Sequence, residues 1–173
     1  MFRADSVGRQ LWKALGQGHV SLQEQRRLRL RQTFNLDVSD DAADALFADY
    51  LQHYECAWTL LPGAREFLDA TANLPRVIVT NGHKPQALRK TAKLGLNDLF
   101  LAVVTPEDSG ARKPDPRIFL HALKILGVSA REALMIGDNL EADLLPAQAL
   151  GMKTFHVNHL DNSQSIRHAA SVA

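Results

Sequence analysis

The sequence has 173 residues, with 20 Lys and Arg against 19 Asp and Glu, so the formal net charge is +1. Its length suits one domain or a small core with an inserted subdomain, and 46% hydrophobic and 23% charged residues are typical of a globular protein. The near-neutral balance provides no basic surface for nucleic acid, and a single cysteine, Cys56, excludes intramolecular disulfides and Cys-rich zinc sites. With neither a signal-peptide pattern nor an apolar run of about 20 residues, we expect a cytoplasmic protein that binds neither nucleic acid nor membranes.

The first third of the chain predicts helices and no strand. Apolar residues recur at helical spacing over Val7–Leu15, and Ser21 followed by Glu24 is the pattern of a capping box at the start of a second helix. Asp40 and Asp41 stand where a third helix should begin, near the positive end of its dipole. We interpret the arginines of the second helix as a solvated face: Arg26, Arg27, Arg29 and Arg31. Residues 1–57 are therefore expected to form a helical subdomain.

From residue 58 onward, short apolar strands alternate with helices. The expected strands cover residues 76–80, 101–104, 133–136 and 154–157, and the expected helices include residues 85–94, 116–126 and 140–150. Asp115 and Pro116 form an N-cap and first-turn pair, and Gly127 ends the same helix. This alternation predicts βαβ units, and hence an α/β core with a parallel, Rossmann-like sheet over residues 58–173.

Polar residues follow three of these strands at the point where each strand, or the loop after it, faces the ligand-binding edge of a parallel sheet. Thr80 can donate a hydroxyl to a phosphoryl oxygen, and Lys113 supplies a positive charge. Asp138 can hold Mg²⁺, and Asp143 can orient a metal-bound water. Taken alone, these features also fit a turn, a solvated loop lysine and acids at a helix start. Their occurrence together favours a phosphate site.

The same segments resemble motifs of the haloacid dehalogenase-like hydrolases. Residues 77–82 resemble the second motif, residues 112–119 the third and residues 133–143 the fourth, acidic motif. The resemblance implies phosphate binding by Thr80, Asn81 and Gly82, catalysis by Lys113, and metal binding by Asp138 and Asp143. It also implies that residues 1–57 form the helical cap of one branch of the family. Segments 16–18, 60–64 and 80–82 resemble nucleotidase-like members of that branch, including pyrimidine 5′-nucleotidases.

One departure from the family pattern concerns the first motif, a strand that ends in Asp-x-Asp-x-Thr, which this sequence lacks. In the family its first aspartate is the nucleophile and its second the general acid/base, and its strand is the central one, between residues 76–80 and 133–136. We therefore expect an N-terminally truncated and inactive Mg²⁺-dependent phosphomonoester hydrolase, with weak Mg²⁺ binding and a gap in its sheet.

The expected partner is a small phosphorylated metabolite, with a nucleoside monophosphate as one candidate. The unpaired strand edges favour strand exchange or a homo-oligomer. The alternative is a non-catalytic remnant that binds phosphate ligands, or a partner through its open sheet.

Overall fold

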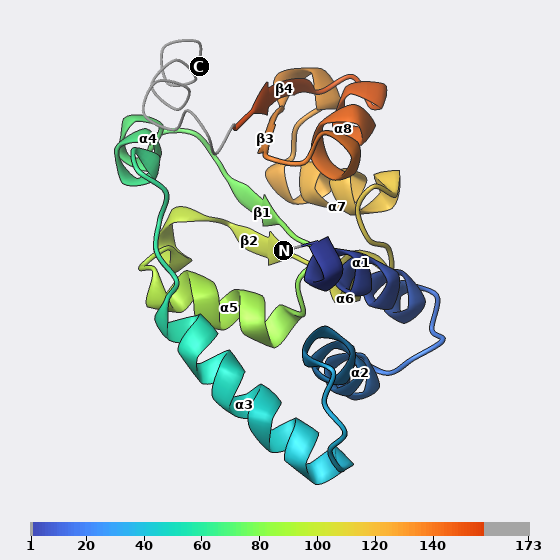
Figure 1. Ribbon diagram of the computed structural model, residues 1–173. Coiled ribbons are helices and arrows are strands. Elements are labelled where there is room, and N and C mark those ends of the chain that lie inside the picture. The colour runs from blue at the N-terminus through green and yellow to red at the C-terminus, as the bar shows by residue number, and fades with distance from the viewer. Residues whose placement is uncertain (1, 158–173) are drawn as a thin grey trace. The chain divides into compact units, whose positions relative to one another are not determined.

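A computed structural model describes residues 2–157 of the chain (Figure 1). The chain divides into two compact units, Met1–Ala57 and Trp58–Ala173, and each is described by itself. The predicted core over residues 58–173 extends into residues 158–173, which lie outside the described residues. Among residues 2–157, no helix combines the length and the apolar character that crossing a bilayer requires.

The first unit is helical, as its sequence predicts. Its described part contains α1 (Phe2–Gly16), α2 (Leu22–Phe34) and α3 (Asp40–Cys56). The predicted capping box begins α2: Ser21 Oγ accepts from Glu24 N at 3.1 Å, and Glu24 Oε2 accepts from Ser21 N at 3.4 Å. Ser39 caps α3 by accepting from Ala42 N at 3.3 Å. Side chains that bond orphan N–H groups thus fix where both helices begin.

The arginines of α2 join it to α3 instead of forming only a solvated face. Arg27 Nε donates to Asp44 Oδ1 at 2.8 Å, and one guanidinium nitrogen of Arg31 donates to Asp40 Oδ1 at 2.8 Å. The two aspartates lie one turn apart on α3, so they present both carboxylates to α2. The interpretation of these arginines as solvated was wrong for Arg27 and Arg31, because Asp44 and Asp40 of α3 accept hydrogen bonds from them.

The second unit alternates strands and helices and confirms the predicted α/β class. Its helices are α4 (Ala64–Ala70), α5 (Lys84–Lys93), α6 (Pro106–Ser109), α7 (Pro116–Leu126) and α8 (Leu145–Ala149), and its strands are β1 (Val77–Val79), β2 (Ala102–Val104), β3 (Leu134–Gly137) and β4 (Lys153–His156). Two 3₁₀ turns, η1 (Asn97–Leu99) and η2 (Ala130–Glu132), and a π-helical segment, η3 (Leu140–Leu144), complete it within residues 58–157.

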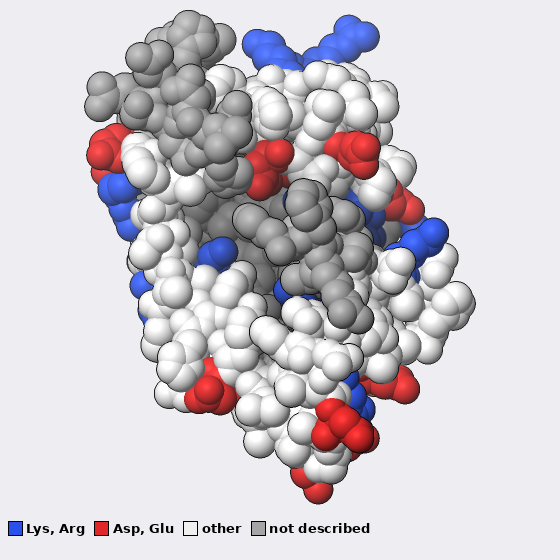
Figure 2. Space-filling view, viewed as in Figure 1, with Lys and Arg blue, Asp and Glu red and all other residues white. Residues whose placement is uncertain are grey.

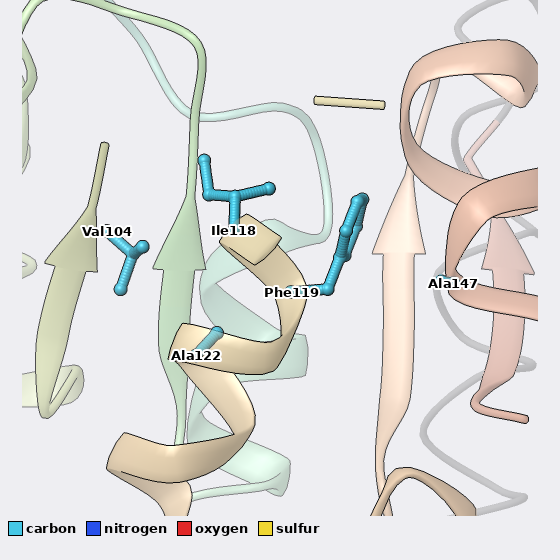
Figure 3. Packing of buried hydrophobic residues seen from close by; sticks show 5 residues of the cluster. All are labelled: Val104, Ile118, Phe119, Ala122 and Ala147. Carbon is cyan, nitrogen blue, oxygen red and sulfur yellow. The ribbon is translucent and has the colours of Figure 1, made fainter. Parts of the chain in front are cut away.

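The strands form two separate two-stranded parallel sheets, not one continuous sheet. Ile78 of β1 lies opposite Val103 of β2, and Ile136 of β3 lies opposite Phe155 of β4. In Figures 1 and 3, β1 and β3 are the inner strands and face each other. We call the facing sides of β1 and β3 the open edges, because no strand among residues 2–157 pairs with them.

Helix α7 provides the core of this unit. Asp115 Oδ1 caps it by accepting from Arg117 N at 2.9 Å, and Gly127 ends it at φ 68°, as predicted. Ile118 and Phe119 are 0% and 1% exposed and pack in one cluster with Val104 of β2 and Ala147 of α8. In Figure 3, Ile118 lies beside β1, whereas the Phe119 ring points toward β3. A single helix therefore contributes side chains to both small sheets.

The predicted helix over residues 140–150 is in fact two segments. Leu144 N donates to Asn139 O at 3.3 Å, and Leu145 N donates to Leu140 O, so the chain follows π-helical hydrogen bonds before α8 begins. Pro146 has no N–H to donate to the carbonyl of Ala142, so an uninterrupted α-helical ladder is excluded there.

Candidate phosphate site

Thr80, Asn81 and Gly82 directly follow β1, at the carboxyl end of the strand. Gly82 N donates to Thr80 Oγ1 at 3.0 Å. Since the hydroxyl is the acceptor in this bond, its proton can still be donated to a ligand. A Cβ at residue 82 would stand 3.2 Å from Thr80 Oγ1, so the glycine permits this tight turn.

Lys113 lies between α6 and α7, and its side chain reaches both sheets. Its Nζ donates to Val79 O, at the end of β1, at 3.0 Å. The same Nζ lies 2.6 Å from Asp143 Oδ1, in the segment that follows β3. The two side chains are 13% and 6% exposed. This buried ion pair links the carboxyl ends of the two sheets. The sequence predicted both residues at one edge of the sheet, but not the pair that they form.

Asp143 is placed by the π-helical segment and by a glycine. Its Oδ2 accepts from Asn139 N at 3.3 Å, and Asn139 Oδ1 caps the segment by accepting from Ala142 N at 2.8 Å. A Cβ at Gly137 would lie 2.7 Å from both Cβ and Oδ2 of Asp143. Only a glycine at this position lets the carboxylate pack so closely against the end of β3.

Asn81 contacts the main chain of Lys113 through both ends of its side-chain amide. Asn81 Nδ2 donates to Lys113 O at 2.9 Å, and Lys113 N donates to Asn81 Oδ1 at 2.7 Å. Arg112 adds a third bond, from a guanidinium nitrogen to Asn81 O at 2.8 Å. The turn after β1 and the Lys113 loop are thereby held to each other.

A cluster of charged residues next to this turn was missed by the sequence analysis. Lys84 pairs with Asp108, and His83 Nε2 lies 4.0 Å from Glu107 Oε1. Burial would raise the pKa of Asp108, but hydrogen bonds from Lys84 and Thr105 outweigh it, so this pKa lies below its ordinary value. The signal was present: Thr105 and Asp108 have capping-box spacing, and they form that box at α6.

The described residues do not by themselves form a magnesium site. Asp143 is already engaged by Lys113 and Asn139, and Asp138 is exposed at the end of β3. Among residues 2–157, no group of three or more His, Cys, Asp or Glu side chains is arranged to hold a metal ion. Mg²⁺ prefers an octahedral set of oxygen ligands, and two carboxylates, one of them paired with a lysine, fall short of that set.

Charges of both signs are interspersed on the visible face of the molecule. In Figure 2, Lys, Arg, Asp and Glu side chains are scattered among uncharged residues, and neither sign covers a broad area of the described part of that face.

A sequence model of the haloacid dehalogenase-like hydrolases matches residues 3–151. A glyceraldehyde 3-phosphate phosphatase from Pyrococcus abyssi is 41% identical over 54% of this chain and 40% of its own length. A ribulose-1,5-bisphosphate 5-phosphatase from Halopiger xanaduensis is 33% identical over 75% of this chain and 54% of its own length. A pyrimidine 5′-nucleotidase, YjjG from Escherichia coli, is 35% identical over 58% and 45%. The chain thus spans about half the length of these relatives, or less.

The fold is also similar to that of solved structures. The hydrolase YfnB from Bacillus subtilis, whose structure has magnesium bound, superposes with a TM-score of 0.79. The two share 22% identity over 98% of this chain and 79% of the other, so this similarity concerns the fold.

Proposed function

Because the chain belongs to the haloacid dehalogenase-like hydrolases, we propose that it forms the phosphate-binding part of a phosphomonoester hydrolase. The observation that carries this proposal is the ion pair of Lys113 and Asp143, 2.6 Å apart, at the carboxyl ends of β1 and β3. This edge is where parallel sheets bind ligands. The three relatives support a small phosphorylated metabolite as substrate, because a triose phosphate, a sugar bisphosphate and a nucleotide share one group, a phosphate monoester. The same proposal includes a nucleoside monophosphate as one candidate substrate and the cytoplasm as the location of the protein.

The residues at this edge have complementary roles in the proposed site. Thr80 donates its hydroxyl proton to a phosphoryl oxygen, and the main-chain N–H of Asn81 adds a donor beside it. The N–H of Gly82 is bonded to Thr80 Oγ1 and shapes the turn. Lys113 directs a positive charge at the phosphoryl group and stabilises the charge that develops there in the transition state. Asp143 keeps the Lys113 ammonium in place.

Hydrolysis also needs an attacking group, and the sequence contains no Asp-x-Asp-x-Thr segment. We infer that a strand at the open edges, between β1 and β3, brings the two aspartates. A carboxylate oxygen of the first then forms a bond to phosphorus, while the ester oxygen leaves with a proton from the second. Water subsequently cleaves the acyl phosphate and releases inorganic phosphate. Without that strand the chain is inactive.

Magnesium belongs to this proposal only in combination with the added strand. Asp138 would hold the ion together with carboxylates from the strand, with Asp143, which is bonded to Lys113 and Asn139, in a supporting role. A bound Mg²⁺ would offset negative charge on the phosphate. The affinity of this chain alone for Mg²⁺ is accordingly weak, and calorimetric titration measures it.

The test is release of phosphate from glyceraldehyde 3-phosphate, ribulose 1,5-bisphosphate and uridine 5′-monophosphate in the presence of Mg²⁺. The chain is assayed alone and with a synthetic peptide of an apolar strand that ends in Asp-x-Asp-x-Thr. We expect no release by the chain alone and release by the mixture. A peptide with Asn as its first acid should give none, and Thr80→Val should slow release by about 100-fold, the effect of one lost transition-state donor.

Three outcomes separate the alternatives. Release by the chain alone that disappears in Asp138→Asn would overturn the inference that an attacking group is missing. Binding of inorganic phosphate without release in any mixture would support a non-catalytic, phosphate-binding protein. Neither binding nor release would overturn the proposed site.

A further inference from the structure

The side chain of Asn81 lies at the proposed phosphate site, but both of its polar atoms are already bonded. Nδ2 donates to Lys113 O at 2.9 Å and Oδ1 accepts from Lys113 N at 2.7 Å. The two bonds join a side-chain amide to one residue of main chain 32 positions away. With one bond at each end, the amide has only its second N–H and its second oxygen lone pair left for a ligand.

The bonds of Asn81 bear directly on the ammonium group of Lys113. A lysine side chain has a flexible four-carbon stem and loses much rotamer freedom when it is fixed. Here its main chain is held by Asn81, and its Nζ is held by Val79 O at 3.0 Å and Asp143 Oδ1 at 2.6 Å. The Lys113 side chain is thus restrained at both ends, at its main chain and at its ammonium group.

Arg112 strengthens the same connection from the neighbouring position. Its guanidinium donates to Asn81 O at 2.8 Å, so the side chain and the main chain of Asn81 are both bonded to the Arg112–Lys113 dipeptide. The three bonds make the turn after β1 and the lysine loop one unit. A displacement of Asn81 therefore moves Lys113 as well.

We propose that Asn81 is a positioning residue, whose side chain fixes Lys113 for phosphate binding rather than contacting the phosphate. The inference rests on the proposed function, since it assigns Lys113 to the phosphate. The two neighbouring side chains then have different roles: Thr80 acts through its hydroxyl on the phosphate, and the side chain of Asn81 acts through Lys113 on another loop. Pre-organised donors of this kind bind charge without reorganising when the ligand arrives.

A double-mutant cycle with inorganic phosphate tests the proposal. The affinities of the wild-type chain, Asn81→Ala, Lys113→Met and the double variant are measured by NMR titration. We expect Asn81→Ala to weaken binding by about 10-fold, on the scale of a hydrogen bond to a charged group, and to have little effect once Lys113 is methionine. An equal loss in both backgrounds would mean that Asn81 contacts phosphate directly and would overturn the proposal. Asn73→Ala, the same change at an exposed asparagine outside the site, should bind as the wild type does.

Hydrogen exchange gives a readout that needs no phosphate and no Lys113 variant. The Lys113 N–H bonded to Asn81 Oδ1 should exchange at least about 10-fold faster in Asn81→Ala, while core amides of α7 stay unchanged. Unchanged exchange at Lys113 in a folded Asn81→Ala chain would overturn the positioning role. If the wild-type chain binds no phosphate but Lys113 exchange still responds, the proposed phosphate site fails and the Asn81–Lys113 contact stands.

Discussion

Lys113 and Asp143 are both nearly buried, so their ion pair is a stability feature as well as part of the site. Removing two charges from water is unfavourable, and the attraction between them offsets this only while both partners are present. Lys113 also has Val79 O as an acceptor, and Asp143 also has Asn139 N as a donor. Loss of the lysine would thus leave a carboxylate that is 6% exposed with one long hydrogen bond.

We expect Lys113→Met to lower the free energy of unfolding by about 3–5 kcal/mol, the usual effect of leaving one buried charge unpaired. The double variant Lys113→Met with Asp143→Leu should recover most of that loss, because neither charge remains. Urea unfolding followed by NMR signals of β3 measures both. Lys124→Met, at an exposed lysine of α7, is the control and should change stability by less than about 0.5 kcal/mol. A similar small change in Lys113→Met would show that the pair is not buried in solution.

Among the helices, α7 and the α2–α3 pair are stabilised by different kinds of contact. Helix α7 buries its apolar face almost completely, with Ile118 and Phe119 in contact with elements of both sheets. Helices α2 and α3 are joined instead by charged hydrogen bonds at half-exposed positions. The stability of α7 should therefore depend on side-chain volume, and the contact between α2 and α3 should depend on pH.

Two adjacent residues of α7 test the first expectation. Phe119→Ala removes a side chain that is 1% exposed and should lower the free energy of unfolding by about 3–5 kcal/mol through lost burial and a cavity. Leu120→Ala changes a side chain that is 50% exposed, and its effect should stay near or below about 1 kcal/mol. Thermal and urea unfolding compare the two. Equal effects would contradict the orientation of α7.

The α2–α3 pair should loosen in acid. A hydrogen bond from the Arg27 guanidinium, helped by one from the Gln23 amide, lowers the pKa of Asp44 to about 2. Because the folded pKa lies below the unfolded one, about 4, the contribution of Asp44 is fully present above pH 4 and is lost as the pH falls toward 2. NMR signals of Arg27 should follow this transition, and in Asp44→Asn they should not. A transition at the same pH in both chains would exclude Asp44 as its source.

For the molecule as a whole, the open edges of β1 and β3 are the feature with the widest consequences. Strands of a parallel sheet are normally buried on both faces, yet Val77, Ile78 and Val79 are only half-buried, and Leu134 is 41% exposed. Unpaired edges of this kind favour pairing with another segment.

Hydrogen exchange can detect a strand at the open edges. Thr80 N donates to Val104 O, on the β2 side, so alternation along the strand directs the N–H groups of Val77 and Val79 to the open edge. We expect these two amides to exchange quickly in the chain alone and to become protected by the Asp-x-Asp-x-Thr peptide. The amide of Ile78, which points to β2, is the internal control and should change little. Protection of Val77 and Val79 without the peptide would show that the edge is already covered in solution.

Much of this arrangement follows from local sequence. Ser21, Asp115 and Gly127 define helix ends through contacts within a few residues, so their roles were predictable. The contact of Lys113 with Asp143 and the bonds of Asn81 to Lys113 join segments 30 or more residues apart. They depend on how two loops meet, and no spacing in the sequence encodes that. The π-helical segment was missed: the sequence predicted one helix over residues 140–150, whereas Pro146 has no N–H to donate to the carbonyl of Ala142.

The two separate sheets also have a consequence for how activity would depend on the concentration of an added strand. If the attacking carboxylate arrives on a separate strand, turnover is governed by a binding equilibrium between chain and strand. The rate should then rise hyperbolically with strand concentration and saturate, and half-saturation should report the affinity of the strand rather than that of the substrate. In such a mixture, strands of different sequence could tune the rate without any change in the residues of the chain itself.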